Sequence, residues 1–336
     1  MMQPEKRLSL DSLEGKCVFI TGGTGLIGRT LIRNILENTK TTSVLACVRN
    51  PEKAQKVLSP WLSSGRLSLT VSDILAPITV SEKIDYIVHA ASETSSKAFV
   101  NKPTATIFTA IDGTRNMLEL ARQKQVEAFV YLSTMEVYGA PSTDEKIFEN
   151  HPTNLDTTQV RSSYPESKRL CETLCTAYAT EYGVPTKILR LTQTFGPGVA
   201  YNDGRIFAEF ARCVIENRDI ILHTKGETKR NYLYTEDAAT AILAVLQYGE
   251  KGNAYNAANE STYCSIYEMA NLVAQKIACG KIKVVIDESD PTKFGYAPTL
   301  HMNLDTSKLR ALGWEPSVSL EEAFRRMIQD MQSLPQ

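Results

Sequence analysis

The feature that most constrains this chain is an apolar run that ends in three regularly spaced glycines, within residues 18–28. The glycines are Gly22, Gly25 and Gly28, and apolar residues at helical spacing follow them, which predicts a buried strand, a tight turn and a helix. Gly22 would permit the turn, Gly25 would let backbone approach a pyrophosphate, and Gly28 would let the helix pack against the strand. We therefore expect a dinucleotide at this turn, the alternative being a glycine-rich turn without a ligand.

Length and composition narrow the remaining possibilities. The chain has 336 residues, enough for a large core and two domains or lobes, and a formal net charge of −1, which does not favour nucleic acid or an anionic membrane as partner. No apolar run reaches transmembrane length, and the N-terminus lacks the apolar core of a signal peptide. The seven cysteines are scattered and Cys171 and Cys175 lack a partner pair nearby, which predicts buried thiols in a cytoplasmic protein and no metal site.

Strand-like runs alternate with helical patterns through the first part of the chain. The expected strands are residues 17–21, 43–48, 67–71, 86–90, 128–133 and 186–191. Helical patterns between them include residues 116–125 and 167–182. This alternation predicts an α/β fold with a doubly wound parallel sheet, the Rossmann arrangement, covered by helices on both faces.

The regular alternation ends after residue 198, where shorter elements follow. The expected helices are residues 205–217, 238–248, 266–279, 308–312 and 320–331, and the expected strands are 219–222, 231–234 and 254–258. They predict a smaller α/β substrate lobe with the ligand cleft between the lobes. We expect a dinucleotide-binding domain of residues 15–192 with about 230–258, a substrate lobe of 193–229 and 259–332, and an N-terminal lead-in of 1–14.

The residue after the second strand bears on the choice of cofactor. Dinucleotide folds usually carry an acidic residue there that binds the ribose hydroxyls of NAD. This chain has Arg49, with Lys53 close behind, and a guanidinium suits a 2′-phosphate. We therefore expect NADP(H) in preference to NAD(H). The alternative is that Arg49 is a solvated charge that stacks on the adenine.

Ligands of such sheets bind at the carboxyl ends of the strands, which defines further cofactor contacts. Asp73, at the end of the third strand, would meet the adenine amino group. His89 ends the fourth strand, and we expect it to be a packed strand residue and not a catalyst. The other expected contacts come from the first helix and from the residues after the third and fourth strands: Leu26, Ile27, Ile74, Ala90, Ala91 and Ser92.

Tyr164 and Lys168 form the pair that carries chemistry. They are four residues apart at the start of a predicted helix and so share one face. A tyrosine ordinarily titrates near ~10, and a neighbouring ammonium favours the phenolate, so we expect Lys168 to lower the pKa of Tyr164. Tyr164 would then donate or accept a proton near neutral pH. The alternative is an ordinary exposed tyrosine and lysine.

At this point the chain resembles the extended short-chain dehydrogenase/reductase family, in its NAD-dependent epimerase/dehydratase group. The resemblance covers about residues 15–330. The matching pieces are the glycine turn, Asp73, Ala90-Ala91, Ser133-Thr134, Tyr164 with Lys168, and Arg190-Leu191. The resemblance implies a catalytic set of Thr134, Tyr164 and Lys168 beside the nicotinamide, a nucleotide-linked sugar as substrate, and a homodimer formed through a four-helix contact.

One segment is most similar to nucleotide-sugar decarboxylases and dehydratases. Residues 134–139 read Thr-Met-Glu-Val-Tyr-Gly, which places Glu136 as a further acid or base. The resemblance also implies substrate contacts from Thr94, Gln193, Arg205 and Arg230.

The chain departs from the family pattern at four positions. Met135 replaces the acid of 4,6-dehydratases, and a thioether cannot protonate a leaving hydroxyl. Ala110 and Gln193 replace asparagines, and an arginine often found near Pro298 is absent.

These observations lead to three functional hypotheses. The first is an oxidoreductase that transfers hydride from NADPH to a ketone on a nucleotide-activated sugar or ketose, with Tyr164 as proton donor. The second is an epimerase or decarboxylase that keeps its cofactor and uses Glu136 as an extra acid or base. The third is a cofactor-binding regulator without turnover, against which the intact Tyr164–Lys168 pair argues.

Overall fold

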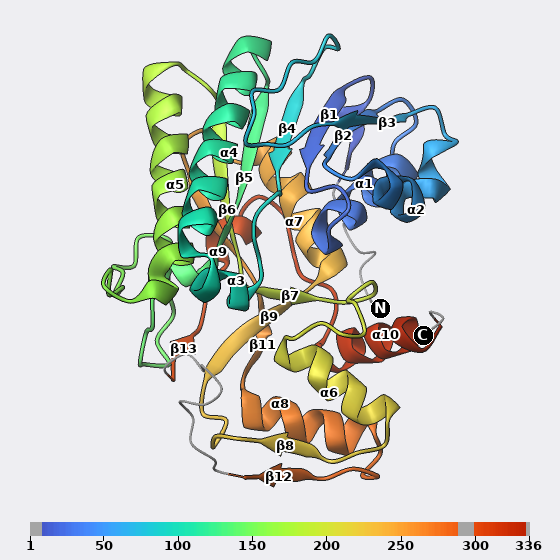
Figure 1. Ribbon diagram of the computed structural model, residues 1–336, viewed down its shortest axis with the longest axis vertical. Coiled ribbons are helices and arrows are strands. Elements are labelled where there is room, and N and C mark those ends of the chain that lie inside the picture. The colour runs from blue at the N-terminus through green and yellow to red at the C-terminus, as the bar shows by residue number, and fades with distance from the viewer. Residues whose placement is uncertain (1–8, 288–298, 334–336) are drawn as a thin grey trace.

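A seven-stranded parallel sheet forms the centre of the computed structural model, which describes residues 9–287 and 299–333 (Figure 1). Its strand order is β10-β6-β5-β4-β1-β2-β3. The strands are β1 Cys17–Thr21, β2 Ser43–Val48, β3 Leu67–Val71, β4 Tyr86–His89, β5 Ala128–Thr134, β6 Thr186–Leu191 and β10 Ala254–Ala257. The order reverses between β1 and β4, and ligands of open α/β sheets bind at such a point. The predicted doubly wound parallel sheet is confirmed.

Helices cover both faces of this sheet. They are α1 Leu26–Asn38, α2 Pro51–Leu62, α3 Ser96–Asn101, α4 Pro103–Lys124, α5 Ser163–Glu181, α7 Thr235–Tyr248 and α9 Ser307–Arg310. On one face, Leu31 of α1 and Ile242 of α7 belong to one apolar core. On the other, α4 and α5 lie side by side, and Met117 and Cys171 belong to a second core (Figure 1). Cys171 and Cys175 are fully buried free thiols, as expected from the sequence.

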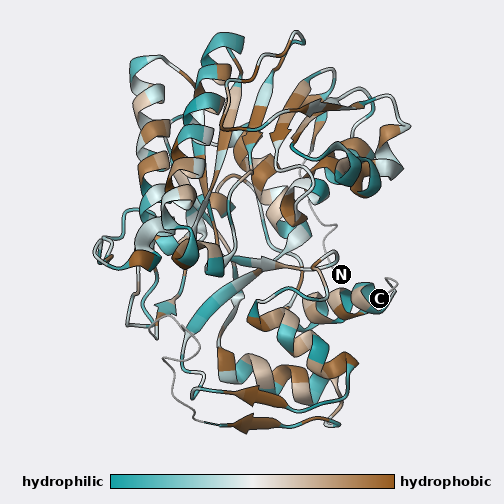
Figure 2. Ribbon diagram, viewed as in Figure 1, coloured by the Kyte–Doolittle hydropathy of each residue, from teal (hydrophilic) through white to brown (hydrophobic). Residues whose placement is uncertain are grey.

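The second half of the chain builds a separate set of small sheets with its own core. Strand β9 (Lys229–Tyr234) pairs with β7 (Gln193–Phe195), β11 (Asn259–Ser265) and β13 (His301–Met302). A two-stranded sheet joins β8 (Ile220–Leu222) to β12 (Val284–Ile286), and both strands are strongly apolar (Figure 2). The helical elements are α6 Ile206–Ile215, α8 Ile266–Leu272, the π-helix η4 Val273–Ile277 and α10 Leu320–Ser333.

Several predicted boundaries differ from the observed ones. Residues 266–279 were expected to form one helix, but the structure divides them into α8 and a π-helical segment. Strand β9, assigned by the predicted division to the dinucleotide-binding domain, pairs with strands of the second region, and the division itself stays a prediction. In the lead-in, residues 1–8 lie outside the described residues, whereas Leu13 is fully buried. Pro298 also lies outside the described residues.

Helix α1 joins the two regions. Leu26 packs against the core of the second region, and the Arg29 guanidinium donates to the carbonyl oxygen of Gly198. The N–H of Gly198 donates in turn to Asp330 Oδ2 of α10 at 2.6 Å. Gly198 has a φ of +90°, a left-handed conformation that favours glycine, and a Cβ atom there would displace the end of the Arg29 side chain.

A buried histidine provides a test of the fold. His89 is 2% exposed in β4, and burial lowers its pKa to about 3. An unfolded histidine titrates near ~6.5, so between about pH 6.5 and 3 the unfolded chain binds a proton that the folded chain does not. Stability is therefore lost as pH falls through this range. Below pH ~6, the free energy of unfolding of wild type, measured with urea, should fall by about 1.4 kcal/mol per pH unit more steeply than that of His89→Asn. Equal slopes for the two proteins would contradict this assignment.

Candidate functional site

The glycine turn after β1 has the geometry expected of a phosphate-binding turn. Gly22 has a φ of +71°, and a Cβ atom there would lie 2.9 Å from the carbonyl carbon and oxygen of Ala90. A Cβ atom at Gly28 would collide with the carbonyl oxygen of Gly22. Gly25 is the N-cap of α1 and has no side chain to accept from the first N–H groups. The turn thus fits a pyrophosphate, with Leu26 and Ile27 as the first residues of the helix.

The ends of β1 and β4 are joined by one hydroxyl group. Thr21 Oγ1 accepts from the backbone N–H groups of Ala90 and Ala91 at 3.1 and 3.0 Å and lies 2.8 Å from His89 Nδ1. Since Thr21 accepts twice, its hydroxyl proton is free to donate to His89. His89 is therefore a packed strand residue, as predicted. Ser92 follows, and its hydroxyl donates to the carbonyl oxygen of Glu93.

Of the residues predicted to contact the adenine end of the cofactor, Arg49 and Asp73 are exposed at strand ends and the side chain of Ile74 is not. Arg49 directly follows β2 and is exposed, while Asn50 caps α2 by accepting from the N–H of Lys53 at 2.9 Å. Asp73 follows β3 and is exposed. The side chain of Ile74 is instead buried beneath α4, so it packs in the core and leaves only its backbone for a cofactor.

The predicted catalytic side chains come together at the end of β5 and the start of α5. Thr134 ends β5, hydrogen-bonds Tyr164 and accepts from the N–H of Glu136 at 3.3 Å. Lys168 Nζ donates to the carbonyl oxygen of Leu132 at 2.8 Å and lies 6.0 Å from the ring centroid of Tyr164. Helical spacing brings the Tyr164 phenol and the Lys168 ammonium to one side of α5. The end of β5 brings the Thr134 hydroxyl to the same place, at the carboxyl edge of the sheet.

The expected direction of the Tyr164 pKa is wrong. Burial raises the pKa of Tyr164, and the charge of Glu136 raises it further, against a hydrogen bond from Thr134 and the charge of Arg161. Burial likewise lowers the pKa of Lys168 to about 8. Both shifts share one cause, because a low-dielectric interior disfavours the charged form of each group. Tyr164 is thus a protonated acid in this structure.

Two side chains that the sequence analysis did not select lie beside Tyr164. Arg161 Nη2 pairs with Glu136 Oε2 at 2.8 Å, and the Arg161 guanidinium carbon lies 4.9 Å from the ring centroid of Phe99. The rings of Phe99 and Tyr164 are stacked, with centroids 4.1 Å apart. Arg161 precedes Tyr164 by three residues, a spacing that signals a shared helix face, whereas Phe99 carries no comparable sequence signal.

The predicted substrate contacts are only partly brought together. Gln193 and Arg230 lie on paired strands, and Arg230 Nη1 donates to Gln193 Oε1 at 3.4 Å. The Nε atom of Arg230 is buried and, among the described residues, has no hydrogen-bond partner. Arg205 is instead held by Asp203, with one contact of 2.6 Å, and Thr94 is exposed.

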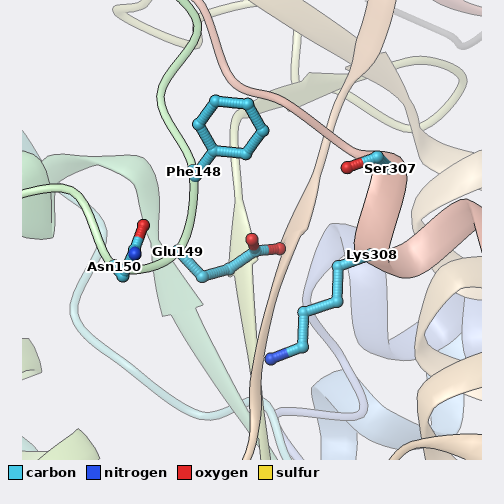
Figure 3. A pocket seen from close by; sticks show the side chains of 5 residues that line it. All are labelled: Phe148, Glu149, Asn150, Ser307 and Lys308. Carbon is cyan, nitrogen blue, oxygen red and sulfur yellow. The ribbon is translucent and has the colours of Figure 1, made fainter.

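One cavity of the described part of the chain lies away from these residues. It has a volume of about 560 Å³ and is lined by Phe148, Glu149, Asn150, Ser307 and Lys308 (Figure 3). Its charged groups already hydrogen-bond to the region of the edge strand β10, since Glu149 accepts from the N–H of Asn256 and Lys308 donates to Asn253. In residues 9–287 and 299–333 we find no cluster of metal-ligating side chains. Nor does any helix of that part of the chain have the length and apolarity needed to cross a membrane.

Curated relatives and solved structures resemble the chain over nearly its whole length. UDP-glucuronic acid decarboxylase 6 of Arabidopsis thaliana is 30% identical over 316 residues, covering 93% of this chain and 88% of the relative. UDP-glucuronic acid decarboxylase 1 of Xenopus tropicalis is 29% identical, covering 95% and 73%. UDP-glucose 4-epimerase of Thermotoga maritima has a TM-score of 0.80 at 21% identity, covering 94% and 98%, which supports the fold.

A solved structure of UDP-glucuronic acid 4-epimerase from Bacillus cereus, in complex with UDP-glucuronic acid and NAD, has a TM-score of 0.78 at 22% identity, covering 94% and 99%. A family model described as the NAD dependent epimerase/dehydratase family matches residues 18–258. These matches confirm the resemblance drawn from the glycine turn and the Tyr164–Lys168 pair. The chain therefore belongs to the NAD-dependent epimerase/dehydratase family of enzymes.

Proposed function

We propose that the chain is a nucleotide-sugar epimerase or decarboxylase, which oxidises and then re-reduces its substrate with a dinucleotide that it keeps. The observation that carries this proposal is Glu136, an ionisable side chain fixed beside Tyr164 by Arg161. A simple reductase has no use for a second acid or base there. The curated relatives also favour this second hypothesis from the sequence over the first, a ketoreductase with net consumption of NADPH.

The residues around Tyr164 divide the work of moving protons. When bound, the dinucleotide would supply the acceptor and donor of hydride. Once its own proton has left, Tyr164 would take the proton of a sugar hydroxyl and later return it, with Thr134 hydrogen-bonded to the same oxygen and Lys168 holding the nicotinamide ribose. Glu136 would exchange a second proton at a neighbouring carbon or its substituent.

The substrate proposed is a nucleotide-linked sugar, with UDP-glucuronic acid as the first candidate because several relatives carry that name. Gln193 and Arg230 are the proposed diphosphate contacts, since the buried Nε of Arg230 lacks a partner among the described residues and a guanidinium suits phosphate oxygens. Arg205 and Thr94 remain proposed contacts further out. Met135 is buried and accepts from Thr192, so no acid for dehydration stands at that position.

A second candidate, a net reductase that uses NADPH, is favoured by one observation. Arg49 follows β2 at the position where an acidic residue would bind NAD. The family model and the NAD-containing neighbour point to NAD, so a preference for NADP(H) stays a proposal. We also retain the cytoplasmic location and the division into a dinucleotide-binding domain and a substrate lobe as proposals.

The first prediction of this function separates the two candidates. Tyr164→Phe should abolish conversion of UDP-glucuronic acid, and Glu136→Gln should slow it by about 10²–10⁴-fold, because each loses a proton-transfer group. Product should form without net change in dinucleotide absorbance. The control is Glu315→Gln, which removes an exposed arginine pair away from these residues and should leave the rate unchanged. Stoichiometric NADPH loss with a nucleotide-linked keto sugar as substrate, nearly unchanged in Glu136→Gln, would instead establish the reductase.

The second prediction concerns cofactor choice. Arg49→Asp should weaken the binding of NADPH relative to that of NADH, because it removes a cation and adds charge repulsion at the 2′-phosphate. Dissociation constants for both dinucleotides, measured by calorimetry, provide the test. Lys56→Asp, the same charge change on exposed α2, is the matched control. Tighter binding of NADH than NADPH by wild type would refute the preference.

The third prediction concerns assembly. We propose a homodimer in which α4 and α5 pair with their counterparts in a second copy, as the family resemblance implied. Phe108 on α4 and Leu170 on α5 are 56% and 45% exposed. Light scattering should find a dimer for wild type and a monomer for Phe108→Glu with Leu170→Glu. Tyr248→Glu, at the end of α7 and 47% exposed in wild type, should remain dimeric. A monomeric wild type at micromolar concentration would exclude the dimer.

A further inference from the structure

We infer that Arg161 is a positioning residue, which holds Glu136 beside Tyr164 and offsets its negative charge. The inference rests on the proposed role of Tyr164 and Glu136 in proton transfer. It adds to that role a third group, which need not touch the substrate.

The first argument is mechanical, because Arg161 is held from two directions. Its guanidinium contacts the Glu136 carboxylate at 2.8 Å and the ring of Phe99 at 4.9 Å, a distance typical of a cation over an aromatic face. Phe99 is 2% exposed, and its carbonyl oxygen accepts from the hydroxyl of Ser163 at 2.9 Å, so the ring is a fixed support. The same ring stacks on Tyr164. Phe99 therefore fixes Arg161 and Tyr164 relative to each other.

The second argument excludes a role in stability. The side chains of Arg161 and Glu136 are 35% and 32% exposed, and ion pairs at such exposure contribute little to the free energy of unfolding. A planar fork nevertheless fixes the direction of a carboxylate. The benefit of this pair is therefore orientation of Glu136.

The third argument is electrostatic. The titratable and charged groups that face Tyr164 come from four elements: Glu136 from η2 (Met135–Tyr138), Arg161 from η3 (Val160–Ser162), Tyr131 from β5 and Lys168 from α5. Phe99, from α3, is uncharged. After burial, the largest influence on the pKa of Tyr164 is the charge of Glu136, which raises it, whereas Arg161 lowers it. The two side chains therefore act on Tyr164 in opposite directions.

This opposition couples two proton transfers. When Glu136 takes a proton, the negative charge that opposes ionisation of Tyr164 disappears, while Arg161 keeps its positive charge. Release of the Tyr164 proton then becomes easier. An epimerase or decarboxylase needs both transfers in one catalytic cycle, and Arg161 would set the balance between them without itself giving or taking a proton.

The first test is the pH dependence of kcat/KM for the full-length enzyme with NAD and UDP-glucuronic acid. Where activity rises with pH as Tyr164 ionises, Arg161→Gln should displace the rise to higher pH by about one unit. Arg161→Lys keeps the charge without the planar fork, so its rise should stay at the wild-type pH with a lower kcat. Arg310→Gln, which removes an exposed arginine pair, is the control and should match wild type. These shifts are not expected from a merely structural residue.

The second test is independent of the substrate. Crystal structures of wild type and Arg161→Gln should be compared. In the variant, the Glu136 carboxylate should have turned away from the position that it has in wild type. The inference would be overturned if the carboxylate of Arg161→Gln has not moved. It would also be overturned if the rise of kcat/KM with pH is unshifted in Arg161→Gln while Tyr164→Phe is inactive. Either result would leave the proposed function standing. Retained activity in Tyr164→Phe would overturn the proposed function itself. If Arg161→Gln does not fold, a displaced rise in Arg161→Lys would equally refute the inference.

Discussion

The close approach of β1 to β4 is the contact on which the candidate site depends. Gly22 brings the turn within contact distance of the Ala90 carbonyl, and Thr21 ties the two strand ends together with one hydroxyl. Any side chain at Gly22 would push the strand ends apart. The contact lies where the strand order reverses, which is the point at which open α/β sheets bind their ligands, and it holds the two strand ends together there.

Burial governs the chemistry that this frame supports. The interior raises the pKa of Tyr164 and lowers that of Lys168, so the structure holds a neutral phenol beside an ammonium that is easily discharged. Lys168 also lies over the ring of Tyr131, with its Nζ 4.8 Å from the ring centroid. A bound ligand that excludes water and brings its own charge would therefore decide when the proton moves.

The sequence was most informative where a pattern is both local and buried. Strands β1, β2 and β3 have the predicted bounds because their apolar runs are flanked by turn residues, and the Tyr164–Lys168 spacing needs only one helical turn. The direction of the Tyr164 pKa could not be predicted, because it depends on burial depth. Phe99 was missed because its contact with Tyr164 joins segments 65 residues apart. Short strands such as β12 exist only through pairing with a distant partner.

The path from Arg29 through Gly198 to Asp330 connects the last helix, α10, to α1. Arg29 lies one turn after the capping glycine of α1, and Gly198 follows β7, which carries Gln193. A shift of α10 would therefore act through one backbone unit on α1, whose N-terminus is the proposed phosphate site. The position of the C-terminal helix and the position of the glycine turn are in this way tied to each other through a single peptide unit, although the two segments lie at opposite ends of the sequence.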